Sequence, residues 1–357
     1  MQLSDFDYEL PEELIAQQPL EQRDASRMLV LDRETQTYTD FKFANFPEHV
    51  RAGDVVVVNN TRVFPARLIG QRDPSGGRVE VLLVRELESQ LRSQSQSTPA
   101  ASIWEALVRP GHRLKEGARL RFGDGALRAE VLKTLAKGLK QLQFTGDRPF
   151  ETLLAESGET PLPPYIRRPT GTSAADRERY QTVYARERGA IAAPTAGLHF
   201  TPEIFAALRA RGARVVEVTL HVGYGTFEPV RVDDLEQHRV AAEFFQIDEA
   251  AANVINESRK EGGRVIAVGT TTTRALESAA NADGKIEAGA RDTELTITPG
   301  YKFRVTDALL TNFHLPQSSL LLLVSAFAGR DFTLAAYRHA VAARYRFYSY
   351  GDCMFMI

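Results

Sequence analysis

Residues 201–220 read TPEIFAALRARGARVVEVTL, which predicts a capped helix followed by a strand. Thr201 is a favoured N-cap residue, and the proline after it suits the first helical turn, where an amide hydrogen is not needed. Gly212 predicts the end of the helix, because glycine readily adopts the conformation that terminates one. The β-branched run at 213–220 predicts a strand. This segment is therefore typical of an α/β domain.

The same alternation recurs further along the chain. Asp248 is expected to cap a helix that runs to Lys260, and residues 264–269 form an apolar run typical of a buried strand. A further helix is predicted at 272–280. Strands that alternate with helices predict βαβ units. We therefore expect a mostly parallel sheet in an α/β domain, to which the predicted strand at 28–32 also belongs.

A second pattern, of short β-type runs separated by turn residues, precedes these units. The runs lie at 55–58, 79–84, 103–108, 118–122, 127–132 and 139–144. Short strands at this spacing predict a β-barrel or sandwich. We expect a discontinuous α/β catalytic domain of residues 1–60 and 150–357, interrupted by a small antiparallel β-barrel of residues 61–149. The Ser/Gln-rich run at 89–100 is expected to be a long hairpin loop with no assigned function.

Composition narrows the class of protein. The chain has 357 residues, 43% apolar and 25% charged, which is typical of a globular protein with about two domains. Cys353 is the single cysteine, so neither an intramolecular disulfide nor a cysteine-based zinc site is expected. The acidic N-terminal segment has the wrong charge for a targeting peptide. We therefore expect a cytoplasmic location.

Membrane and polyanion partners receive no general support from the sequence. The longest apolar run, 320–328, is about half of the ~20 residues needed to cross a bilayer, and predicts a buried helix or strand. The net charge is −2, so a nucleic-acid site must be a local basic patch. Arg167 and Arg168 lie in one of two arginine-rich stretches. Such a stretch is also typical of a solvated surface.

Dinucleotide, P-loop, nucleophile-elbow and zincin signatures are all absent from the sequence. What remains is a set of polar junctions at predicted strand ends, where open α/β sheets bind ligands. At the first junction, His199 precedes the helix capped by Thr201. The positive end of a helix disfavours imidazolium, so His199 is a candidate neutral base. The alternative is a histidine that only caps or packs.

The second junction is LHVGYGTF, residues 220–227, which contains His221. Gly223 and Gly225 would let backbone amides approach a ligand, and Tyr224 and Phe227 would offer aromatic faces to an adenine or a cation. The alternative is a glycine-rich turn with packed aromatic rings.

The third junction is VGTTTTRALES, residues 268–278. The amides and hydroxyls of Gly269, Thr270, Thr271 and Thr272 at a helix start would bind a carboxylate, a phosphate or a ribose. The alternative is a helix with surplus capping residues.

The fourth junction places Asn312, Phe313 and His314 in a loop before a largely apolar segment. Polar groups mounted beside a rigid buried element favour a site, although a plain loop would have the same pattern. The C-terminal RYRFYSYGDC, residues 344–353, combines cations, rings and a carboxylate, or forms an aromatic lid over the core.

The wording and order of these motifs resemble the S-adenosylmethionine:tRNA ribosyltransferase-isomerase family of the queuosine pathway. The resemblance covers essentially the whole chain and rests on NNTRVFPARL (59–68), PLPPYIRR (161–168), YQTVYA (180–185), APTAGLHF (193–200), LHVGYGTF, VGTTTTRALES, LLTNFHLPQSSLLLLVSAFAG (309–329) and YRFYSYGD (345–352).

The resemblance implies an α/β domain with an inserted β-barrel. It also implies transfer of the ribosyl group of S-adenosylmethionine to 7-aminomethyl-7-deazaguanine at the tRNA wobble position, which gives epoxyqueuosine, adenine and methionine. S-adenosylmethionine would be consumed as a substrate, with no cofactor or metal. The expected partners are that substrate and the tRNA, without a membrane or an obligate protein partner.

The chemistry of this reaction suggests roles for the residues. The sulfonium acidifies the C5′ hydrogens, so a base is required, and a second group should protonate the departing adenine. We expect His199, His314 and His221 to serve these roles, with His199 first, and Arg167 and Arg168 to contact tRNA. Two alternatives remain: an RNA-binding protein without catalysis, and a hydrolase with a Thr or Ser nucleophile and a His base.

Overall fold

The computed structural model describes residues 1–89, 102–169, 171–227, 230 and 232–357. Contacts divide these residues into two units. The larger consists of Met1–Arg62, Pro163–Arg167 and Glu178–Ile357, and the smaller of Val63–Leu162 and Arg168–Arg177. The predicted fold class, an α/β domain interrupted by a barrel, is confirmed. The smaller unit extends past residue 149 because α1 (Phe150–Ser157) packs on its strands.

The larger unit is built on a sheet whose described strands number nine, in the order β16-β14-β13-β3-β15-β17-β18-β1-β2. The four central strands, β13 to β17 in that order, are parallel. The sheet is mixed rather than mostly parallel, because β14, β16 and β2 pair antiparallel and β18 enters antiparallel to β17 beside β1. The bounds are β16 (Gly289–Thr293), β14 (Glu243–Ile247), β13 (Arg214–Leu220), β3 (Val55–Asn59), β15 (Val265–Val268), β17 (Ala308–Asn312), β18 (Cys353–Met356), β1 (Arg27–Asp32) and β2 (Thr37–Lys42).

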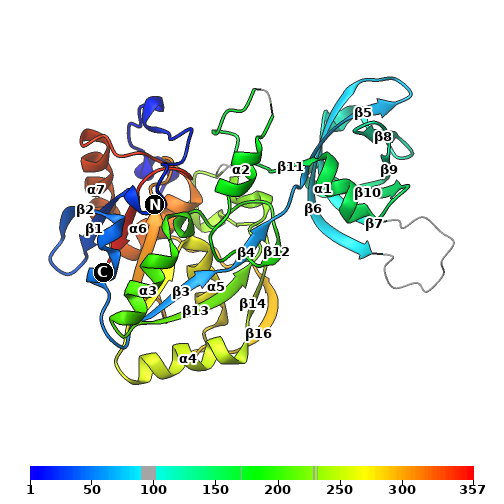
Figure 1. Ribbon diagram of the computed structural model, residues 1–357. Helices are drawn as coiled ribbons and strands as arrows, with labels where there is room; N and C mark the ends of the chain where they lie inside the picture. Colours follow the sequence, from blue (N-terminus) through cyan, green and yellow to red (C-terminus); the bar gives the residue numbers. More distant parts are fainter. Residues whose placement is uncertain (90–101, 170, 228–229, 231) are drawn as a thin grey trace. The chain divides into compact units, whose positions relative to one another are not determined.

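Helices bury both faces of the central strands (Figure 1). Val56 and Val58 of β3 join a cluster with α3 (Pro202–Ala210) and the 3₁₀ helix η4 (Phe43–His49). Side chains alternate along a strand, so Val55 and Val57 face the other side, where α4 (Glu249–Lys260) and α5 (Thr270–Ala279) contact the sheet. All four valines are at most 1% exposed. This explains why a continuous apolar run forms the strand.

The predicted helix caps are confirmed in atomic detail. The Thr201 hydroxyl accepts a hydrogen bond from the amide of Ile204 at 3.3 Å, and the Asp248 carboxylate accepts one from Ala251 at 2.7 Å. Helix α5 begins at Thr270, two residues before the predicted start, because Gly269 acts as its N-cap with a φ of +91°.

The apolar run at 320–328 forms the buried helix α6 (Ser319–Ala328), followed directly by α7 (Arg330–Ala342). Gly329 makes the sharp turn between them with a φ of +86°. Within the described ranges, no single helix has the length and apolar character to cross a membrane; α6 and α7 would do so only as a pair bent by 115°.

The smaller unit is a six-stranded antiparallel barrel, closed by the pairing of β5 with β8. Its strands are β5 (Arg67–Asp73), β6 (Arg78–Ser89), β7 (Ser102–Arg109), β8 (Arg119–Phe122), β9 (Leu127–Thr134) and β10 (Leu139–Gly146), and β11 (Gly158–Glu159) adds to β5. Of these, β5 escapes sequence prediction because it is half polar. The loop predicted at 89–100 lies outside the described residues apart from Ser89.

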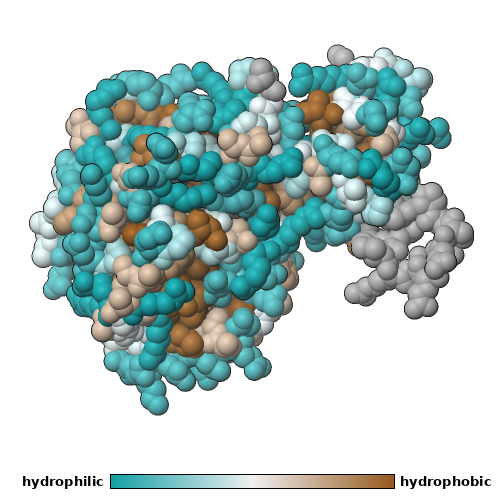
Figure 2. Space-filling view, viewed as in Figure 1, coloured by the Kyte–Doolittle hydropathy of each residue, from teal (hydrophilic) through white to brown (hydrophobic). Residues whose placement is uncertain are grey.

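Apart from 3₁₀ helices, the remaining described elements are β4 (Thr61–Val63), which pairs with β12 (Glu187–Ala190), and the short helix α2 (Ala174–Arg179). On the face drawn in Figure 2 the surface is largely hydrophilic, and apolar residues gather in its recesses.

Candidate active site

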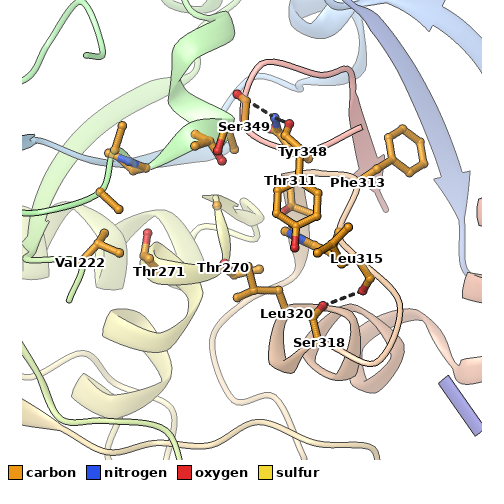
Figure 3. Close-up of a pocket in the computed structure, with 18 of the residues that line it drawn as sticks. Val222, Thr270, Thr271, Thr311, Phe313, Leu315, Ser318, Leu320, Tyr348 and Ser349 are labelled. Atoms are coloured by element: carbon orange, nitrogen blue, oxygen red, sulfur yellow. Dashed lines mark hydrogen bonds between the residues drawn. The ribbon is translucent and has the colours of Figure 1, made fainter. Parts of the chain in front are cut away.

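A cavity of the larger unit lies where the central parallel strands end (Figure 3). Its empty space is about 1110 Å³ with the open mouth included. Gly269, Thr270 and Thr271 enter it after β15, and residues 311–320 enter it after β17. Carboxyl ends of parallel strands meet at one edge of a sheet, so two of the predicted junctions converge here.

The remaining wall combines segments that are distant in sequence. It includes Tyr165, Tyr180, residues 192–196, Val222, Tyr348 and Ser349. None of the residues that line the described cavity is an aspartate, glutamate, lysine or arginine. Aromatic rings and hydroxyls without charged competitors suit a ligand with a flat ring or a cationic centre.

The threonine junction divides into residues that face the cavity and residues that hold the helix. Thr270 and Thr271 are 6% and 8% exposed and line the cavity. The Asn59 amide at the end of β3 donates to the Thr271 hydroxyl at 3.4 Å. Thr272 is fully buried and its hydroxyl donates to the Val268 carbonyl at 2.6 Å. Unlike Thr270 and Thr271, Thr272 does not line the cavity, because its hydroxyl is used within the helix.

Among the described residues that line the main cavity, His314 is the one histidine. Its Nε2 lies 3.0 Å from the Thr311 hydroxyl, and its Nδ1 makes no hydrogen bond to a described residue. The main chain is held on both sides, because the amide donates to the Tyr337 hydroxyl and the carbonyl accepts from the Tyr8 hydroxyl. Burial lowers the pKa of His314 to about 3, so the ring is neutral at pH 7.

Asn312, which lines the cavity, is hydrogen-bonded to the buried His199, which does not. The Asn312 amide nitrogen donates to the Tyr348 carbonyl at 2.8 Å, which turns its oxygen toward Nε2 of His199 at 3.2 Å. Nε2 must therefore carry the proton, and Nδ1 accepts from the Ser26 hydroxyl at 2.6 Å.

Both ring nitrogens of His199 are thus occupied, and burial lowers its pKa to about 4. His199 does not line the main cavity; it lines a smaller one beside it. This geometry positions Asn312 and the segment at Tyr348, and leaves no ring nitrogen of His199 directed at the main cavity. Phe313 is fully buried among aromatic rings, and Figure 3 shows its ring pointing away from the cavity.

The glycine junction lies elsewhere. His221 Nδ1 is 2.8 Å from the Thr61 hydroxyl, its ring stacks on Phe244, and burial lowers its pKa. The amide of Gly223 donates to the Glu243 carboxylate at 2.8 Å.

Neither His221 nor Gly223, Tyr224 or Gly225 lines the main cavity, where Val222 represents this segment. The substrate contacts expected of Gly223, Tyr224 and Gly225 therefore stay a prediction. Phe227 ends the 3₁₀ helix Tyr224–Phe227, but its side chain lies outside the described part of the chain.

Arg167 and Arg168 are both engaged in ion pairs. Arg168 makes a bidentate pair with Asp176, at side-chain exposures of 14% and 6%, and Arg167 pairs with Glu12 on the surface. A buried pair of this kind neutralises the guanidinium. Arg168 is therefore a poor phosphate contact.

Several cavity residues were missed from the sequence. Tyr165, Tyr180 and Ser349 stand inside the quoted motifs, yet nothing in their local pattern directs them to one place. Within the described ranges, no group of three or more His, Cys, Asp or Glu side chains is arranged to hold a metal ion.

Comparison with known proteins gives consistent matches over the full length. Residues 3–356 match the family described as Queuosine biosynthesis protein. The chain is 48% identical over 357 residues to an S-adenosylmethionine:tRNA ribosyltransferase-isomerase from Pelotomaculum thermopropionicum, and 49% identical over 357 residues to one from Symbiobacterium thermophilum, with 100% of both chains covered in each case. It also resembles the crystal structure of S-adenosylmethionine tRNA ribosyltransferase from Thermotoga maritima, with a TM-score of 0.54, 37% identity, and coverage of 99% of this chain and 100% of that one.

Proposed function

The chain belongs to the S-adenosylmethionine:tRNA ribosyltransferase-isomerase family of queuosine biosynthesis, and from this premise we propose that it modifies 7-aminomethyl-7-deazaguanine at the tRNA wobble position. The enzyme transfers and isomerises the ribosyl group of S-adenosylmethionine. The products are epoxyqueuosine in tRNA, adenine and methionine. The observation that carries this proposal is 48% identity to such an enzyme across the whole of both chains.

S-adenosylmethionine binds in the main cavity and is consumed there. The hydroxyls of Thr270 and Thr271 and the free amides at the start of α5 hold its ribose or its carboxylate. Tyr165 and Tyr348 offer aromatic faces to the adenine and to the positive sulfonium. A wall without lysine or arginine avoids repulsion of that sulfonium.

His314 is the residue we assign to proton transfer, in place of His199. The sulfonium acidifies the C5′ hydrogens, and a base must remove one of them. With a pKa of about 3 the imidazole is neutral at pH 7, and its free Nδ1 is available to accept a proton. A buried base is intrinsically weak, but the same low dielectric strengthens its attraction to an acidified hydrogen. Thr311, bonded to Nε2, holds the ring in place.

Release of adenine tests the proposal directly. The enzyme is incubated with S-adenosylmethionine and tRNA that carries 7-aminomethyl-7-deazaguanine, and free adenine, methionine and the modified nucleoside are quantified. Adenine and methionine should appear in equal amounts with the new nucleoside. S-adenosylhomocysteine, which lacks the sulfonium, and tRNA with guanine at the wobble position are the controls. Binding of tRNA without adenine release would favour the RNA-binding alternative, and S-adenosylmethionine cleavage without transfer would favour a hydrolase.

A cytoplasmic location is part of the same proposal. Its support is the tRNA substrate itself, which is modified where tRNA is made and used.

A further inference from the structure

A second, smaller cavity of the larger unit is lined by three arginines, Arg23, Arg179 and Arg346. They come from distant parts of the chain: a 3₁₀ helix near the N-terminus, the end of α2 and the segment before β18. Ser349, labelled in Figure 3 on the wall of the main cavity, also lines this one. The two cavities therefore adjoin.

Among the residues that the structure describes, the three guanidinium groups bond only to main-chain carbonyls. Arg23 donates to Leu198 at 3.1 Å, Arg179 donates to the carbonyls of residues 20 and 21 at 2.6 and 3.0 Å, and Arg346 donates to residue 18. No carboxylate of the described chain forms an ion pair with any of them. An arginine has five N–H donors, so several remain. Nε of Arg179 and Nη1 of Arg346 are buried without a hydrogen-bond partner among the described residues.

The nearest acidic groups, Asp352 beside Arg346 and Glu178 beside Arg23, attract these guanidinium groups only through space and form no hydrogen bond with them among the described residues. Asp352 accepts from the main-chain amides of Arg27 and Arg346 at 2.9 and 2.8 Å and contacts no guanidinium. Glu178 is exposed on the surface. Burial and the neighbouring Arg179 lower the pKa of Arg23, as expected for cations crowded together. Partly buried cations with unused donors are costly unless a bound anion satisfies them.

We propose that the cavity lined by Arg23, Arg179 and Arg346 binds a phosphodiester group of the tRNA, beside the nucleotide whose base enters the main cavity. Guanidinium groups suit phosphate oxygens. The cavity, about 320 Å³ with its open mouth included, is less than a third of the size of the main one at about 1110 Å³. An enzyme that modifies one base must hold the backbone on either side of it. In a chain of net charge −2, a local cluster is where that attraction must come from. This inference rests on the proposed function.

The carboxylate of S-adenosylmethionine has similar oxyanion chemistry, and the experiment separates the two sources. Arg23→Gln, Arg179→Gln and Arg346→Gln are made singly, and Arg330→Gln on α7 is the control, since it removes one charge from a surface pair with Asp331. The dissociation constant for a tRNA transcript is measured at several salt concentrations, together with the KM for S-adenosylmethionine at saturating tRNA. Arg346→Lys, which keeps the charge, tests for partial rescue.

Each cavity variant should bind tRNA about tenfold more weakly at moderate salt, with the log–log salt slope shallower by about 0.7 for a single-stranded phosphate. The KM for S-adenosylmethionine should stay within about twofold, and Arg330→Gln should behave as the wild type. A raised KM with tRNA affinity unchanged would overturn the proposal in favour of the carboxylate. A lowered melting temperature with both constants unchanged would also overturn it, because the arginines would then only hold the N-terminal segment in place.

The experiments distinguish failure of the proposed function from failure of the phosphate-site proposal. If the wild type released no adenine from S-adenosylmethionine, the function would fail, whereas the tRNA salt slopes would still decide whether the arginine cavity holds a phosphate.

Discussion

Replacement of His199 by glutamine should make the free energy of unfolding less dependent on pH below neutrality. In the folded protein burial lowers the pKa of His199 to about 4 from an ordinary 6.5. The unfolded chain therefore takes up a proton as the pH falls below 6.5, while the folded chain does so only near pH 4. The stability from this group is complete above pH 6.5 and is lost as the pH falls through that interval.

The magnitude follows from the two pKa values. Between pH 6.5 and pH 5, an interval of roughly 1.5 pH units, His199 is protonated in the unfolded chain but not in the folded one. This difference lowers the free energy of unfolding by about 2 kcal/mol. Glutamine cannot titrate, so His199→Gln should lack this loss. It should also be less stable at pH 7.5, by about 1–3 kcal/mol, because Ser26 and Asn312 lose a well-placed partner in a buried setting.

The measurement is chemical denaturation of wild type and variant at half-unit steps from pH 7.5 to 5. Unfolding is followed by circular dichroism, and the free energy of unfolding is compared at each pH. Turnover at pH 7.5 is measured in parallel, and should stay within a few fold because neither ring nitrogen faces the main cavity. Identical pH profiles for the two proteins would refute the argument from burial. A 10²- to 10⁴-fold loss of turnover with stability little changed would instead make His199 the proton-transfer group.

The other predictions concern the main cavity and the ion pair between Arg168 and Asp176. Thr270→Val with Thr271→Val should raise the KM for S-adenosylmethionine and leave tRNA affinity intact in a binding assay, whereas Thr272→Val should leave that KM unchanged because its hydroxyl bonds only within α5. His314→Gln should lower kcat by ~10²- to 10⁴-fold while both substrates still bind by calorimetry; unchanged kcat would remove it from the chemistry. Arg168→Ala should lower the melting temperature of the barrel without changing the salt slope of tRNA binding, since Asp176 already neutralises it; a shallower slope would restore it to the tRNA footprint.

Local sequence determined much of the fold. The helix caps at Thr201 and Asp248, the buried strand at β3 and the buried helix at α6 follow from features within about ten residues: side-chain period, cap chemistry and apolar run length. The order of motifs likewise carried the family, because it spans the whole chain. These signals need no knowledge of what lies on the far side of the sheet.

Only the tertiary structure decided which polar junctions form the site. His199 and Asn312 are 113 residues apart, and Ser26 is a further 173 from His199, yet the three share one hydrogen-bonded chain. Their meeting depends on strand order, and on the C-terminal strand β18 entering beside β1. The three histidines look alike as sequence, since each follows an apolar run at a turn. Burial and partner geometry give them different environments, and both are set by residues that come together only when the sheet has closed over its core.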